Sequence, residues 1–196
     1  MTISRLEAFS DAVLAILVTI MVLGLRVPHG GSFRALRPVL PSLLAYVLSF
    51  IYLGIYWNNH HHLLKTVERI SGGVLWANLD LLFWLSLVPF TTAWMSQNQF
   101  DALPVAVYGV VLLLCACAYY VLQMAIKAAT GPSSVLAAAL GRDAKGKGSI
   151  VIYAVAVPLT IVSPWCSLAL YVLVAVLWLV PDRRIEHVLG ARTSEE

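Results

Sequence analysis

Charged residues are scarce in this chain. Only 12% of its 196 residues are Asp, Glu, Lys or Arg, whereas 60% are hydrophobic, and the mean hydropathy is +0.84. Soluble domains carry about twice that charged fraction, so the composition excludes an ordinary soluble protein and predicts an integral membrane protein. The net charge of +3 is small, and we expect no nucleic-acid partner.

The chemical groups typical of enzymes and metalloproteins are also missing from the sequence. Its three cysteines, Cys115, Cys117 and Cys166, all lie in apolar runs. This placement is typical of small buried hydrophobes rather than of a disulfide or a metal site. No nucleophile–base pair, phosphate-binding loop or paired carboxylate set stands out, so we expect neither an enzyme nor a bound cofactor.

The sequence has six apolar segments, and it predicts an all-α membrane protein with six transmembrane helices in residues 1–185. Residues 186–196 are expected to form a short cytoplasmic tail. The stretch 149–181 is too long for one ordinary span, and Pro164 can end a helix at the residue before it. We therefore expect two short helices there, with one span plus a half-inserted piece as the alternative. The expected helices are about 5–25, 39–62, 72–95, 102–127, 149–163 and 165–181.

The charges in the loops predict the orientation of the chain. With a cytoplasmic N-terminus, ten Lys and Arg residues fall inside and three fall outside, namely Arg26, Arg34 and Arg37. This distribution satisfies the positive-inside rule with both termini in the cytoplasm. Two cytoplasmic termini require an even number of spans, which agrees with six.

The first apolar segment has polar residues at its entrance. Ser4 and Glu7 have the spacing of a capping box that would begin the helix, and Ser10 and Asp11 follow. A signal peptide would place its positive charge before a shorter apolar stretch and end at a small-residue cleavage site, which this segment does not do. An ionisable residue such as Asp11 at membrane depth is costly and usually marks a function.

One face of this helix carries Ile16, Thr19, Ile20 and Leu23, which recur at helical spacing. Core packing is the commoner reason for such a pattern, and in a helix that is apolar all round the signal is weak. Asp11 is turned about 140° away from Ile16. Its carboxylate therefore points towards neighbouring helices, where burial requires a partner.

The second apolar segment ends in three adjacent histidines, His60, His61 and His62. Neighbouring residues on a helix diverge by about 100°, so they cannot all bind one ion, and we expect no metal site. The histidines can lie at the membrane interface. Alternatively, one or two of them can hydrogen-bond Asp11 or Ser10 across the helix bundle.

The third segment contributes polar residues of its own. Asn78 lies at about the depth of Asp11, and we expect it to hydrogen-bond between helices. Asp80 faces elsewhere and is expected to be protonated or to reach a Lys or Arg. Pro89 is expected to kink the helix, with the hydroxyls of the following threonines satisfying carbonyls that the kink frees.

Together these residues resemble a known family. Their order and spacing are similar to the signature of the transmembrane protein 175 family of potassium channels, in its prokaryotic single-repeat form. The similarity covers most of the first three helices, and the later helices carry little of the signature. The matching motifs are Arg5-x-x-x-Phe9-Ser10-Asp11, Trp57-x-x-His60-His61, Asn78 and Pro89-Phe90-Thr91-Thr92.

The resemblance implies a homotetramer in a prokaryotic plasma membrane, with a central pore lined by the first helix of each subunit. It implies modest potassium selectivity at a hydrophobic constriction, and the chain has no Thr-Val-Gly-Tyr-Gly filter. By position, Ile16 matches the principal constriction, and Thr19, Ile20 and Leu23 match the next layers outward. The residues implied in a structural polar network are Arg5, Phe9, Ser10, Asp11, Trp57, His60, His61 and Asn78.

Two other functions stay open at the level of sequence. The first is a proton-coupled secondary transporter that uses Asp11 and the His60–His62 cluster, although the chain shows no inverted repeat. The second is a membrane scaffold that conducts nothing. For a channel, the expected partners are other copies of the chain, membrane lipid and permeant K+, with other monovalent cations or H+ as further permeant ions.

Overall fold

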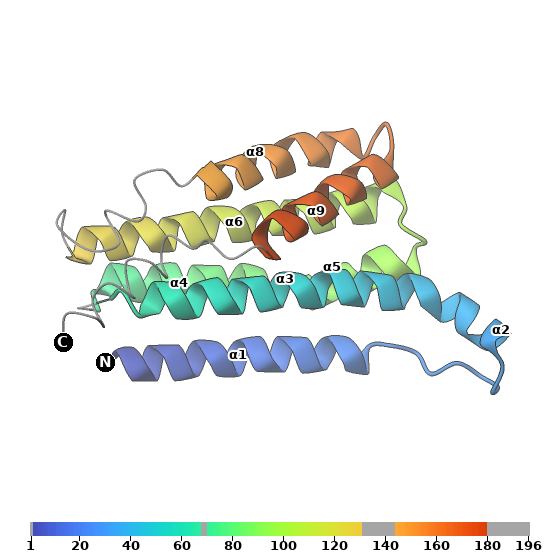
Figure 1. Ribbon diagram of the computed structural model, residues 1–196, viewed down its shortest axis with the longest axis horizontal. Helices are drawn as coiled ribbons and strands as arrows, with labels where there is room; N and C mark the ends of the chain where they lie inside the picture. Colours follow the sequence, from blue (N-terminus) through green and yellow to red (C-terminus); the bar gives the residue numbers. More distant parts are fainter. Residues whose placement is uncertain (1, 68–69, 131–143, 180–196) are drawn as a thin grey trace.

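The computed structural model describes residues 2–67, 70–130 and 144–179, and the regular elements in these ranges are helices (Figure 1). The expected all-helical class is therefore confirmed for the described residues. The expected tail 186–196 and the end of the last expected helix lie outside them. In chain order the elements are α1 (Ile3–Leu23), α2 (Phe33–Leu36), the short 3₁₀ helix η1 (Arg37–Val39), α3 (Leu40–Leu64), α4 (Gly72–Ser86), α5 (Val88–Gln97), α6 (Ala102–Thr130), α8 (Ala144–Leu159) and α9 (Pro164–Leu179).

The described chain has four helical stretches long and apolar enough to cross a membrane. The final pair is shorter, because α8 and α9 have 16 residues each and are about 24 Å long, against about 30 Å of bilayer hydrocarbon. The turn between them ends at Pro164, where a helix break is expected from the sequence. A count of six spans stays a prediction. The four long stretches are Ile3–Leu23, Phe33–Leu64, Gly72–Gln97 and Ala102–Thr130.

The start of α1 differs from the expected capping box. Thr2, not Ser4, is the N-cap: its backbone is extended, and its side-chain oxygen accepts a hydrogen bond from the backbone N–H of Arg5 at 3.4 Å. Ser4 lies inside the first turn, and the Glu7 side chain contacts α3 instead of the helix start. The capping-box prediction is wrong because Thr2 supplies a hydroxyl two residues earlier.

The helix expected at 72–95 is two helices, α4 and α5, separated at Leu87. Pro89 lies in the first turn of α5, where the N–H that it lacks is least needed. The hydroxyl of Thr91 donates to the carbonyls of Leu87 and Val88, and that of Thr92 donates to Val88 at 2.7 Å. The threonine hydroxyls therefore bond carbonyls at this break.

The bundle is layered, with α1 at one edge and α8 at the opposite edge (Figure 1). One cluster of buried apolar side chains joins α1, α3, α4 and α6. A second cluster joins α3, α5, α6, α8 and α9. Because α3 and α6 contribute to both clusters, they form the centre of the subunit. Helix α1 packs against α3, α4 and α5.

A glycine lets α9 approach α6 closely. A Cβ added at Gly109 would lie against the ring of Tyr171, with the ring carbon that bears the hydroxyl 2.5 Å away. Tyr171 is fully buried, and its hydroxyl donates to the carbonyl of Val105 at 3.4 Å. The backbone carbonyl of Tyr171 accepts a hydrogen bond from the hydroxyl of Tyr52 at 2.5 Å, so Tyr171 is held through both its side chain and its backbone.

We expect Gly109→Ala to lower the free energy of unfolding by about 1–3 kcal/mol, because overpacking at this contact displaces Tyr171. The measurement is thermal unfolding of the purified protein in detergent, followed by intrinsic fluorescence. Gly54→Ala in α3 is the matched control, since a Cβ at Gly54 meets nothing within 4 Å. Alanine is the better helix former, so Gly54→Ala is expected to hold or raise the melting temperature. Equal melting temperatures for the two variants would contradict the close approach.

Candidate functional site

Helix α1 has one buried face and one uncovered face. The buried residues are spaced three or four apart, as one helical face requires; they are Leu6, Ser10, Leu14, Leu17 and Met21. The residues expected to line a pore all lie on the uncovered face, with 55% of Ile16, 50% of Ile20 and 82% of Leu23 exposed, and Thr19 exposed between them. The single subunit therefore leaves an apolar stripe of α1 without a packing partner.

A chain of buried hydrogen bonds ties α1 to α3 and α4. His60 on α3 lies 2.7 Å from Asn78 on α4, between the imidazole Nε2 and the amide Oδ1. The Asn78 amide nitrogen donates to the Ser10 hydroxyl on α1 at 3.0 Å, and that hydroxyl donates to the carbonyl of Leu6 at 2.9 Å. His60, Asn78 and Ser10 are each at least 99% buried. Three helices are thus joined at one point inside the subunit.

The donor and acceptor roles along these hydrogen bonds assign the tautomer of His60. Because Asn78 donates through its nitrogen to Ser10, its oxygen is the acceptor for His60, and Nε2 of His60 must carry the proton. His60 Nδ1 is buried and has no hydrogen-bond partner in the described residues. A second proton on Nδ1 would create a buried charge and a buried N–H with nothing to bond, so this arrangement suits a neutral imidazole.

Two further contacts link the antiparallel helices α1 and α3, which lie side by side in Figure 1. The indole N–H of Trp57 donates to Asp11 Oδ1 at 3.0 Å. One turn away, His61 Nδ1 lies 2.6 Å from Glu7 Oε1, and both side chains are partly exposed. The rings of Trp57 and His61 stack with centroids 6.3 Å apart, so the two donors form one continuous surface facing two carboxylates.

The structure brings together six of the eight residues expected in the polar network. Arg5 and Phe9 are not among them: Arg5 is exposed and, within the described residues, bonds through its backbone N–H to Thr2, while Phe9 is 48% exposed. Within the described residues the hydrogen-bond partner of Asp11 is Trp57, and not one of the histidines.

Glu7 is the contact residue that the sequence interpretation missed. It lies four residues before Asp11, and therefore on the same helical face; this spacing is a signal that could have identified it. Asp80 also differs from expectation, because its partner within the described residues is the indole N–H of Trp84 on the same helix, at 3.1 Å. That contact is exposed and lies outside the network.

The chain is similar to known channel proteins. A family model described as the endosomal/lysosomal potassium channel TMEM175 matches residues 5–89. A potassium channel of Chryseobacterium sp. (strain P1-3) is 50% identical over 189 residues, which cover 96% of this chain and 98% of the relative. The crystal structure described as a lysosomal potassium-selective channel TMEM175 homolog from Chamaesiphon minutus matches with a TM-score of 0.74 and 28% identity, covering 91% of this chain and 96% of that one.

An animal relative matches over a shorter range. The endosomal/lysosomal proton channel TMEM175 of Danio rerio is 28% identical over 118 residues, which cover 58% of this chain and 22% of the relative. The full-length match to the bacterial potassium channel confirms the family resemblance expected from the motifs. The chain therefore belongs to the TMEM175 family of ion channels, and it is an integral membrane protein and not an enzyme.

Proposed function

We propose that this chain is the subunit of a homotetrameric, modestly potassium-selective channel in a prokaryotic plasma membrane, with six helices spanning the membrane and both termini cytoplasmic. The first helix of each subunit lines a central pore, and the pore is narrowest at a ring of Ile16 side chains. The observation that carries the proposal is the uncovered apolar stripe of α1, where Ile16, Ile20 and Leu23 are each at least half exposed in the single subunit.

The opposite side of α1 is fully engaged, which supports this orientation. Ser10, Glu7 and Asp11 all contact α3 or α4. Rotating α1 to bury Ile16 would break these contacts, and the buried bond between Asn78 and Ser10 would find no alternative partner in lipid. One α1 helix cannot enclose a pore by itself. Several copies must therefore bring the same stripe to a common axis, and the family resemblance supports four.

The chemistry of the stripe suits a pore that discriminates by dehydration. A ring of isoleucines offers an ion no ligands, so such a constriction can close by dewetting, and a slight widening admits hydrated or partly hydrated cations. Losing water costs less for K+ than for Na+, which gives a modest preference for K+. Next to this ring, the Thr19 hydroxyl donates to the Ile16 carbonyl at 2.9 Å, so its oxygen keeps lone pairs that suit a cation.

The names of the relatives do not favour the transporter alternative, because the bacterial relative is named a potassium channel and the animal relative a proton channel. The animal relative's name supports H+ as a second permeant ion. Purified protein in liposomes tests this directly, since a proton current appears as acidification of the lumen under a pH gradient.

We expect Ile16→Asn to raise single-channel conductance and to reduce the preference for K+ over Na+, because an amide ring stays wet and supplies ligands to either ion. The measurement is the reversal potential with K+ on one side of a planar bilayer and Na+ on the other, using purified protein. That potential should move towards zero in the variant.

The matched control for this experiment is Leu173→Asn. Leu173 is 47% exposed on α9, so the same polar group enters a similarly exposed position away from α1. We expect the control to leave the reversal potential unchanged. An unchanged potential in Ile16→Asn itself would remove Ile16 from the selectivity constriction.

We expect Asn78→Leu to lower the free energy of unfolding by about 2 kcal/mol or more, because in a buried site it removes the acceptor of the His60 Nε2–H and the donor to the Ser10 oxygen, which keeps only its bond to the Leu6 carbonyl. Thermal unfolding in detergent measures the loss. Asn58→Leu on α3 is the control, since Asn58 is exposed and the substitution removes no buried hydrogen bond. Similar melting temperatures for the two variants would contradict the claim that the hydrogen bonds of Asn78 to His60 and Ser10 hold α1 in place.

Asp11→Asn and Asp11→Leu separate the charge of Asp11 from its role as an acceptor. Asparagine keeps an oxygen that can accept from Trp57, whereas leucine does not, so we expect Asp11→Leu to reduce the yield of assembled protein more. In a channel, Asp11→Asn affects opening but leaves the reversal potential of K+ against Na+ unchanged. Loss of proton-coupled uptake with no ion current in any variant would favour a transporter.

A further inference from the structure

The exposed faces of the helices differ in polarity. On α6 and α9 no exposed residue has a charged, amide or hydroxyl side chain, which suits contact with the hydrocarbon chains of lipid. The exposed face of α3 includes the amide of Asn58, and that of α4 includes the carboxyl group of Asp80. Lipid offers a hydrogen-bond partner to neither group, so these two faces need a partner made of protein.

Asp80 is the more demanding of the two groups. It belongs to the stretch Gly72–Gln97, which is long enough to cross a membrane, and it lies about 12 Å along the helix from Gly72. One of its carboxyl oxygens accepts from the indole N–H of Trp84 at 3.1 Å, and that bond is its only hydrogen bond within the described residues. A carboxylate that faced lipid at this depth would be costly.

The buried bond between His60 and Asn78 sets Asn58 and Asp80 at the same depth. Helices α3 and α4 run in opposite directions (Figure 1), and Asn58 lies two residues before His60, whereas Asp80 lies two residues after Asn78. Both are therefore displaced by about 3 Å in the same direction along the bundle. Two residues also turn a helix by about 200°, so each side chain points away from the His60–Asn78 contact.

A ring of copies brings these two faces together. Helix α1 packs against both α3 and α4, which form the layer next to it (Figure 1). When every copy turns α1 to a common axis, the α3 face of one copy meets the α4 face of the next, in the head-to-tail contact that closes a ring. Rotation about an axis along the membrane normal keeps each residue at its own depth, so Asn58 and Asp80 of neighbouring copies meet at one level.

We propose that Asn58 of the partner subunit donates its amide N–H to Asp80, and that this bond lies within a subunit interface formed by the exposed faces of α3 and α4. The inference rests on the proposed homotetramer and names the surfaces through which its copies assemble. Asp80 then accepts one bond from Trp84 of its own helix and one from the neighbouring copy. Large apolar side chains on the same faces are covered at the same time, since 46% of Phe50, 75% of Trp76 and 55% of Phe83 are exposed in the single subunit.

A second copy of the chain suits this face better than other occupants. Lipid headgroups lie outside the hydrocarbon layer, whereas Asp80 lies well inside the stretch that crosses it. An unrelated protein is not required, because the α3 face of the same chain carries the missing donor at the matching depth. The amide of Asn58 has no hydrogen-bond partner within the described residues, so it is available for this contact.

Cross-linking between introduced cysteines tests the contact. Asn58→Cys and Asp80→Cys are combined in the full-length protein, after Cys115, Cys117 and Cys166 have been changed to alanine, and membranes are treated with dibromobimane. This short reagent becomes fluorescent when it joins two thiols, including pairs slightly too far apart for a disulfide. We expect a fluorescent ladder from dimer to tetramer on a denaturing gel. Each single variant should stay a monomer there, because a head-to-tail contact does not pair a residue with itself.

The matched control replaces Asn58→Cys by Leu173→Cys, because Leu173 is 47% exposed on the apolar face of α9. We expect no ladder from Leu173→Cys with Asp80→Cys. Equal ladders from the two pairs, or fluorescence confined to the monomer band, would overturn the contact. Native mass spectrometry of the same samples separates the two proposals: a tetramer without a ladder overturns this interface alone, whereas a monomer removes the tetramer and the interface together.

Leucine variants measure the bond itself. Asp80→Leu and Asn58→Leu are each expected to weaken subunit association about threefold per contact, the size of one hydrogen bond between helices in a membrane. The double variant should be no weaker than either single one, because the bond is already lost. Asp80→Asn keeps an acceptor oxygen and should retain most of the association. The measurement is energy transfer between labelled subunits on dilution with lipid, and additive losses from the two leucine variants would overturn a direct bond.

Discussion

Inside a bilayer, a polar side chain must find its partner within the protein, because lipid offers none. This constraint fixes the position of α1. The bond from His60 to Asn78, and on to Ser10 and the Leu6 carbonyl, satisfies one buried group after another across three helices. Apolar contacts alone would allow α1 to rotate, since it is apolar on nearly every side. The hydrogen bonds select one rotation, and the apolar stripe is left uncovered as a result.

The polar contacts of α1 and its exposed apolar side chains therefore lie on different faces of the same helix. The anchored side has specific partners, and its contacts range from the buried Ser10–Asn78 bond to the exposed Asp11–Trp57 bond. The uncovered side presents an apolar surface. Among the described contacts, the Thr19 hydroxyl on this side bonds within α1, to the carbonyl of Ile16. The proposed function needs both properties, because a ring of helices that rotated freely could not hold a constriction of constant width.

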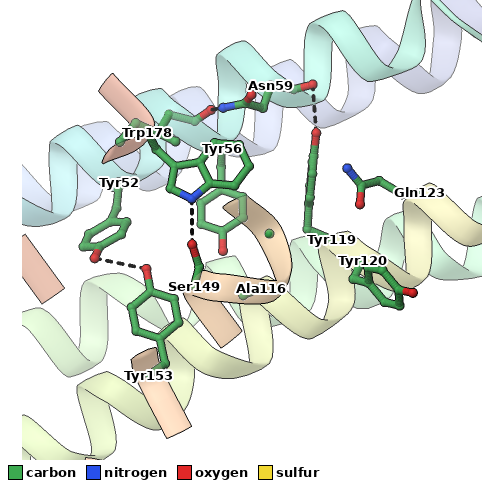
Figure 2. A pocket seen from close by; sticks show the side chains of 12 residues that line it. Tyr52, Tyr56, Asn59, Ala116, Tyr119, Tyr120, Gln123, Ser149, Tyr153 and Trp178 are labelled. Carbon is green, nitrogen blue, oxygen red and sulfur yellow. Dashed lines mark hydrogen bonds between the residues drawn. The ribbon is translucent and has the colours of Figure 1, made fainter. Parts of the chain in front are cut away.

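The sequence predicted the parts of this structure that depend on local pattern. The helical class and the family follow from apolar segment lengths and from motifs at fixed spacing, and the break near Pro89 follows from the chemistry of proline. Pairings between helices were harder to predict. Glu7 was interpreted as part of a cap, and Asp11 was expected to bond a histidine, because the pairing depends on how far α1 is shifted along α3. The cavity among α3, α6, α8 and α9 (Figure 2) could not be predicted from any local sequence pattern, because it is space that the packing of four helices leaves unfilled.

The two carboxylates of α1 and the two donors of α3 repeat at the same interval of four residues. Because the helices run in opposite directions, displacing α1 by four residues, about 6 Å, would bring Asp11 level with His61 while Trp57 faced Ala15. One carboxylate–donor contact would then form where two existed, and the buried bond from Asn78 to Ser10 would be lost as well. The interface thus encodes one sliding register of α1 along α3, because each neighbouring register satisfies fewer polar groups.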